Sequence, residues 1–143
     1  RFFDGHPIRR GEGEPMPDIV WLRPDGTAMQ PEDWESGFGR TIGMFLNGEG
    51  IQGVDSRGGR IVDKHFLVYF NAHTEPVEIT LPVEERSPRW DLVVDTNDGE
   101  VDGVLDPGST FSLGAHALAV LREHTEQSAA DPSVSASLIP GAV

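Results

Sequence analysis

The sequence predicts an all-β fold, an antiparallel β-sandwich of about seven or eight strands. Apolar residues recur at every second position in Val77–Leu81 and Trp90–Val94, and Phe66–Phe70 is apolar throughout. A period of two is the spacing of residues on one face of a strand. Turn residues separate these segments at short intervals, and no stretch has the apolar period of a long helix. Short strands with frequent turns favour a sandwich.

The first third of the chain is predicted to hold one short strand and one helical turn. Residues 1–17 are predicted to be an irregular linker, because they contain three glycines and three prolines. Asp18–Leu22 is predicted to be a strand, and Pro24–Gly26 a turn, since proline fixes one φ and glycine accepts a positive one. Thr27–Met29 can pair back as the second arm. Pro31–Trp34 has a proline and two acids at its start, which predicts a one-turn helix.

The middle of the chain supplies the longest strands. Arg40–Asn47 is predicted to be a strand that ends in an Asn-Gly turn. Phe66–Phe70 and Val77–Leu81 are predicted to be two strands joined by a short reversal. Since Leu67 and Tyr69 make the first of these apolar on both faces, it is predicted to be a central strand. One face would lie in the core, and the other would meet a neighbour absent from this chain.

The last strands are predicted at Trp90–Asp95 and Thr110–Arg122. Trp90, Leu92 and Val94 are expected to face inward. The apolar alternation of the final strand changes phase at Gly114, which predicts a β-bulge there. The strands would place the sandwich domain at residues 18–123. Residues 124–143 are rich in Ser, Ala and Pro and are predicted to be a flexible tail.

Composition excludes several classes of function. The 143 residues suit one domain. A net charge of −13 argues against nucleic acid and anionic membrane surfaces as partners. No apolar run approaches the ~20 residues needed to span a bilayer. The absence of cysteine excludes disulfides, Cys-type zinc sites and thiol nucleophiles, and it fits a cytoplasmic location.

No active site is predicted in this chain. The five histidines and 24 acidic residues show no metal-ligand spacing, and neither a nucleophile elbow nor a three-glycine nucleotide fingerprint is present. Glycoside hydrolysis needs two carboxyl groups held across the sugar, whereas the acids here cluster in polar loops. We therefore predict no catalytic, cofactor-binding or metal-ligating residue.

The three tryptophans are expected to play different roles. Trp90 alternates with Leu92 and is expected in the core, and Trp21 alternates with Ile19 and is expected in the core or an interface. Trp34 stands in a polar segment. Because exposed tryptophans stack on sugar rings, Trp34 is the candidate for a sugar contact, with packing against a missing neighbour or against its own loop as the alternatives.

Six segments in order resemble a known family. They are Arg1–Ile8, Asp18–Gly26, Glu32–Trp34, Arg40–Gly48, Asp63–Pro82 and Ala117–Leu121. With their spacing they resemble the C-terminal β-domain of bacterial glycogen debranching enzymes, isoamylase-type members of glycoside hydrolase family 13. The resemblance implies a non-catalytic domain of an enzyme that hydrolyses α-1,6 branch linkages in glycogen. It also implies that the catalytic carboxylates lie in a (β/α)8 barrel missing here, and that a chain beginning at Arg1 starts inside a longer protein.

The resemblance further implies that this domain packs on that barrel and stabilises it. Its partners would be the barrel and the α-glucan substrate, without a cofactor, and the domain alone would be inactive. Two other readings stay open, because sandwiches host many functions. One is a stand-alone carbohydrate-binding module, and the other is a β-sandwich that recruits another protein.

Overall fold

The computed structural model describes residues 5, 7–8, 16–36, 39–83, 88–97 and 103–126. Regular structure in these residues is almost entirely β. The strands are β1 (Pro7–Ile8), β2 (Met16–Pro17), β3 (Ile19–Leu22), β4 (Thr41–Leu46), β5 (Phe66–Asn71), β6 (Val77–Thr80), β7 (Trp90–Asp95), β8 (Val104–Leu105), β9 (Thr110–Leu113) and β10 (Ala117–Glu123). One helix, α1 (Pro31–Glu35), and one 3-10 turn, η1 (Gly48–Gly50), complete the described elements.

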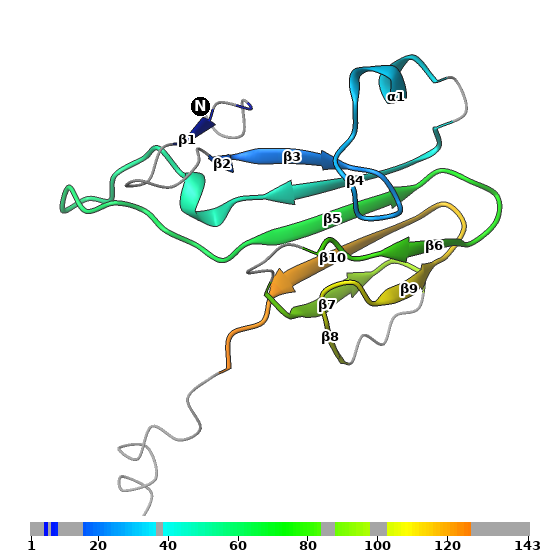
Figure 1. The fold of residues 1–143 in the computed structure, drawn as a ribbon. Helices are drawn as coiled ribbons and strands as arrows, with labels where there is room; N and C mark the ends of the chain where they lie inside the picture. Colours follow the sequence, from blue (N-terminus) through cyan, green and yellow to red (C-terminus); the bar gives the residue numbers. More distant parts are fainter. Residues whose placement is uncertain are drawn as a thin grey trace, which may run out of the picture.

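The strands form two layers, which confirms the predicted all-β sandwich. Six of them make an antiparallel sheet in the order β3-β4-β5-β10-β7-β8. Strands β6 and β9 pair with each other and lie in front of that sheet (Figure 1). A further small pair, β1 and β2, precedes β3 in the chain.

The core fills the space between the two layers. The six-stranded sheet contributes Leu67 and Tyr69 of β5, and the small sheet contributes Ile79, all without exposed surface. Trp90 is 1% exposed, as predicted for a core residue. Each large apolar side chain buried in this way contributes about 1.5–3 kcal/mol relative to an exposed one. The faces that carry these residues therefore hold the layers together.

The link between β5 and β6 differs from the sequence prediction. The two strands follow each other closely but do not pair, because β5 pairs with β4 and β10 whereas β6 pairs with β9. The chain crosses from one sheet to the other over residues 72–76. Both strands turn an apolar face toward the same core, so they stack across it and are not hydrogen-bonded neighbours.

The predicted bulge at Gly114 is wrong. Residues 114–116 form a corner between β9 and β10, which belong to different sheets, and His116 takes a positive φ of 49° there. The phase change in the sequence thus marks the passage between two layers. The predicted single strand Thr110–Arg122 is two strands.

An irregularity in pairing occurs in β7 instead. Leu92 pairs with Leu121 and Val94 pairs with Val120, so Val93 is an extra residue opposite the Val120–Leu121 step. Trp90 and Leu92 face or pack on the core as predicted. Val94 was expected to face inward, but the extra residue turns it to the other side of the sheet, where it is 42% exposed.

The region after β3 folds as predicted. The Arg23 amide donates to the Thr27 carbonyl and the Met29 amide to the Trp21 carbonyl, both at 2.8 Å, so residues 27–29 pair back on the strand. Helix α1 begins at Pro31, as expected for one helical turn.

Both ends of the chain are described only in part. Strands β1 and β2 lie within the predicted linker 1–17. The other residues of that linker, apart from Gly5, lie outside the described residues. The same holds for the predicted tail beyond residue 126.

Candidate functional site

The face of the six-stranded sheet opposite β6 and β9 is apolar, and we call it the open face. Cross-strand partners on a sheet share one face, so rows of residues can be followed across it. One row crosses five strands in the order Trp21, Met44, Val68, Val120 and Val94. These side chains are half-buried or exposed, in contrast to the sealed core on the other face.

Two further rows flank this one. The first contains Ile42, Phe70 and Leu118, and the second contains Ile19, Leu46 and Phe66. Phe70 is 38% exposed. Single exposed apolar residues are common on folded domains, but a contiguous apolar surface is typical of an interaction site.

Strand β5 is therefore apolar on both faces, as the sequence predicted. Leu67 and Tyr69 lie in the core, and Phe66, Val68 and Phe70 lie on the open face. Strand β4, predicted as Arg40–Asn47, also carries apolar residues on both faces. Ile42, Met44 and Leu46 share the open face, whereas Phe45 packs in the core.

Two tryptophans meet at the β3 edge of the open face. Trp21 of β3 and Trp34 of α1 pack with ring centroids 5.5 Å apart and planes 86° apart. Trp21 is 37% exposed, so the expectation of a core position is wrong and the interface alternative stands. Trp34 is 52% exposed, in line with its selection as the exposed aromatic.

An ion pair beside these rings fixes α1 to the turn after β3. The Asp33 Oδ2 atom accepts from Arg23 Nε at 2.8 Å and from the Gln30 amide at 2.6 Å, and Arg23 Nη2 lies 2.7 Å from it. The hydrogen bond from Arg23, and then that from Gln30, lowers the pKa of Asp33. The bond to Asp33 likewise raises the pKa of Arg23. Both groups are therefore charged at neutral pH.

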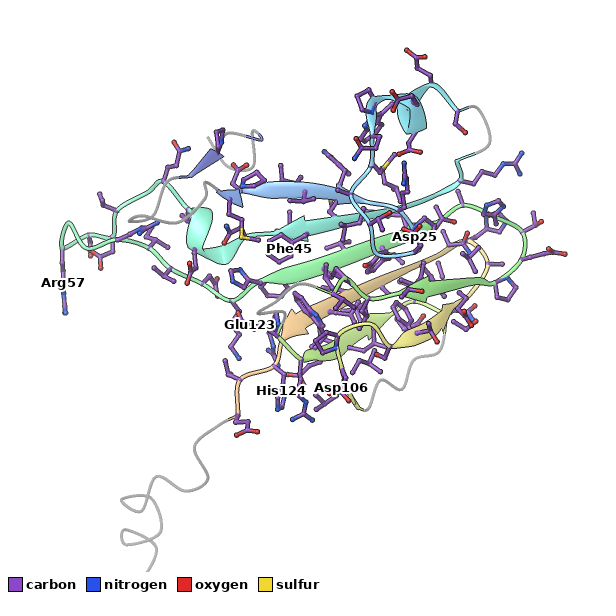
Figure 2. The ribbon with its side chains drawn as sticks, viewed as in Figure 1. Asp25, Phe45, Arg57, Asp106, Glu123 and His124 are labelled. Atoms are coloured by element: carbon purple, nitrogen blue, oxygen red, sulfur yellow. The ribbon has the colours of Figure 1, made fainter. Side chains whose placement is uncertain are left out.

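A hollow of about 320 Å³ opens beside this pair. Arg23, Asp25 and Asp33 supply its charged groups, and Ser36 and Thr41 supply hydroxyls. Asp25 lies on the loop between β3 and α1 (Figure 2). Its Oδ1 accepts from the Thr27 hydroxyl at 2.6 Å and from the Thr27 amide at 2.9 Å, and the hydroxyl bond is the main cause that lowers the pKa of Asp25. The arrangement can bind polar groups.

Among the residues that the structure describes, no three His, Cys, Asp or Glu side chains gather as metal ligands would. His124 Nδ1 lies 2.6 Å from Asp91 Oδ1, a contact that links the segment after β10 to β7. No helix within the described ranges is long and apolar enough to cross a membrane.

The fold and the site define a two-layer β-sandwich domain with one uncovered apolar sheet face. The chain belongs to the isoamylase C-terminal family, whose model matches residues 18–125. The resemblance drawn from the sequence is thereby confirmed.

Relatives of the chain carry the name glycogen operon protein GlgX homolog. Those of Mycobacterium tuberculosis and Mycobacterium bovis are each 46% identical to it over 125 residues. The aligned part is 86% of this chain and 17% of each relative. The chain thus spans about a sixth of the length of the relatives that it matches.

Proposed function

We propose that this chain is the non-catalytic C-terminal domain of a glycogen debranching enzyme that hydrolyses α-1,6 branch linkages. Its task is to pack its open face on the (β/α)8 catalytic barrel and so stabilise it. Membership of the isoamylase C-terminal family and the similarity to glycogen operon proteins support this role. Glycogen breakdown in the cytoplasm is the setting that the proposal implies, and a chain without cysteine fits a reducing compartment.

The open face is the observation that carries the proposal. Two of its rows run across the central strands without a polar interruption, from Ile42 to Leu118 and from Trp21 to Val94, whereas the third meets Arg122 beside Phe66. A stable interface covers ~800 Å² on each partner. Apolar area removed from water contributes about 25 cal/mol per Å², so covering this face with a partner is strongly favourable before binding costs.

The length of the relatives supports the catalytic barrel as the partner. Since the matched part is 17% of each relative, most of such a protein lies outside this chain. The family is a C-terminal one, so that larger part precedes β3. Near that end, the buried Asp18 accepts a hydrogen bond of 2.9 Å from the Gly5 amide through Oδ1. This bond fixes the approach of the chain next to β3, whose Trp21 belongs to the open face.

Substitution of Phe70 by Asp in the full-length enzyme tests the proposal. Phe70 is exposed in the isolated domain, so Phe70→Asp should leave the domain folded, as circular dichroism would show. A carboxylate in an apolar interface has no partner, and we expect a lower Tm and a faster thermal loss of debranching activity.

Val62→Asp is the matched control. Val62 is exposed on the connection between η1 and β5, which projects away from the sheet with Arg57 at its tip (Figure 2). This variant should behave as the wild type does. Equal thermal inactivation of the Phe70→Asp enzyme and the wild type would contradict docking through the open face. A sandwich that recruits a different protein predicts that result as well.

A further inference from the structure

We propose that the corner formed by Trp21 and Trp34 is a binding site for a linear α-1,4-glucan segment. The glucan class rests on the proposed function, whereas the site itself rests on geometry. Helix α1 contributes no buried residue. It is nevertheless held by a proline at its start, by the Gln30 amide and by the Arg23 guanidinium. A helix that adds nothing to the core but is fixed in this way serves to hold Trp34 out at the surface.

The two indole rings form a corner suited to a sugar ring. Because their planes are perpendicular, one ring meets the other with its edge, and that contact covers at most one indole face. Trp34 is 52% exposed and Trp21 is 37% exposed. The C–H groups on the face of a pyranose ring pack on such aromatic faces, while its hydroxyls stay at the rim.

Two carboxylates close to Trp34 in the chain can accept sugar hydroxyls. Asp33 precedes Trp34 in α1, and Asp25 lies on the turn before that helix; the two share a hollow that neither tryptophan lines. All bonds from Arg23 and Gln30 to Asp33 use Oδ2, and both bonds from Thr27 to Asp25 use Oδ1. Within the described residues, Asp33 Oδ1 and Asp25 Oδ2 thus form no hydrogen bond. Both residues line the 320 Å³ hollow, whose size is at the lower end of the range for small-ligand sites. A carboxylate oxygen accepts a hydroxyl proton strongly.

The charges of the site select a neutral ligand. Arg23 balances one of the two carboxylates, which leaves the hollow with an excess negative charge. The whole chain carries −13 as well. Phosphates and acidic sugars are therefore repelled, and a neutral polyhydroxylated chain is the ligand that fits.

The position of the corner relates it to the docked enzyme. β3 is the edge strand of the six-stranded sheet, and α1 follows it in the loop beyond that edge. Trp21 belongs both to this corner and to the open face, so a glucan stacked in the corner would lie at the margin where a docked partner meets β3.

The three tryptophans allow a direct test with the 143-residue chain, because only three indole N–H signals arise in its ¹⁵N-labelled form. Maltoheptaose should shift the signals of Trp21 and Trp34 and leave that of the buried Trp90 in place. Trp34→Ala should weaken the affinity by about tenfold or more, since it removes the stacking face. Val104→Ala, at an exposed position of β8 on the opposite edge of the sheet, should leave the affinity unchanged.

Three outcomes would overturn the proposal. They are no shift of either signal at saturating millimolar maltoheptaose, an unchanged affinity in Trp34→Ala, and an equal response to cellohexaose. An equal response to cellohexaose, which is β-linked, would show that the site does not select α-glucans. None of these results depends on docking, because the measurement uses the isolated chain. Failure of the Phe70→Asp test would leave the sugar titration unaffected, so the two proposals fail separately.

Discussion

The side-chain amide of Asn71 donates a hydrogen bond of 2.9 Å to the backbone carbonyl of Gly114. Asn71 is buried at the end of β5, and its Oδ1 accepts from the Thr41 hydroxyl at 3.2 Å and from the His73 amide at 2.9 Å. Its Nδ2 also lies 3.0 Å from the Glu75 carbonyl oxygen. One side chain thus connects β4, the link between β5 and β6, and the corner between β9 and β10.

Asn71→Asp should destabilise the domain severely. The substitution keeps the shape but replaces a donor with a carboxylate oxygen that faces carbonyl oxygens in a buried position. We expect a loss of about 3 kcal/mol or more in the free energy of unfolding, measured by urea denaturation. Gln52→Ala, at an exposed position of the link between η1 and β5, should change it by less than about 0.5 kcal/mol. Equal losses in the free energy of unfolding for the two variants would contradict a stabilising role for the Asn71 hydrogen bonds.

Gly43→Ala should also weaken the fold. The ring of Tyr69 lies directly over Gly43, and a Cβ there would overlap its Cδ1 and Cε1 atoms. Because Tyr69 is completely buried it cannot move aside, and we expect a cost of about 1–3 kcal/mol from overpacking. Gly39→Ala is the control, because the nearest atom to its Cβ would be 3.8 Å away. Thermal melts of both variants decide the matter, and equal Tm values would contradict the close packing.

The Tyr69 hydroxyl predicts instability at alkaline pH. It is buried and makes no hydrogen bond within the described residues, and burial raises its pKa above the usual 10.0. Above pH 10 the unfolded chain loses this proton while the folded chain keeps it. Stability should therefore fall by about 1.4 kcal/mol per pH unit there, and should be unaffected by this group below pH 10.

Tyr69→Phe tests the same linkage. It removes the isolated hydroxyl, so it should be neutral or stabilising at pH 7 and should abolish this part of the alkaline loss. Tyr69 is the one tyrosine of the chain, so tyrosinate absorbance reports on it alone. That absorbance should appear together with unfolding. Ionisation of the folded protein near pH 10 would contradict the buried position.

The Arg23–Asp33 pair predicts an acid transition at Trp34. The lowered pKa of Asp33 keeps its carboxylate charged below the usual 3.8, so the bond to Arg23 persists on acidification and is lost as the pH falls through the lowered value. The indole N–H signal of Trp34 should stay constant from pH 7 to about 4 and shift only below that range. Asp33→Asn should show the shifted signal already at pH 7, whereas Glu78→Gln, an exposed acid on β6, should not. If the Trp34 signal changes neither at low pH nor in Asp33→Asn, the Arg23–Asp33 pair does not position the Trp34 ring.

Local patterns predicted the strands better than their partners. The two-faced character of β5 could be predicted because every residue of Phe66–Phe70 is apolar, and only a strand covered on both sides needs that. Apolar alternation is the same, however, for strands that pair and for strands that stack across a core. The sequence therefore could not tell that β5 and β6 lie in different sheets. The extra residue Val93 could not be predicted either, because it lies between two other apolar residues and leaves no visible break in the pattern.

The site could be predicted only in outline. Trp34 stood out because its neighbours are polar. Trp21 did not, because both faces of the sheet are apolar and alternation with Ile19 fits either one. The bond between Arg23 and Asp33 joins residues ten positions apart through a turn and a helix start. A proline and an acid predict such a helix, but not which cation reaches its carboxylate.

The rims of the large sheet set a limit on how copies of this protein can associate. Along β3, the carbonyl of Trp21 is already occupied by the amide of Met29, and the opposite rim ends in the two-residue β8. Among the described residues, neither rim offers a long row of vacant backbone donors and acceptors, which is the template on which fibrils grow. The domain exposes an apolar sheet face, but its short or paired edge strands disfavour the growth of ordered filaments. We expect self-association of the isolated domain through its open face to be amorphous and not fibrillar.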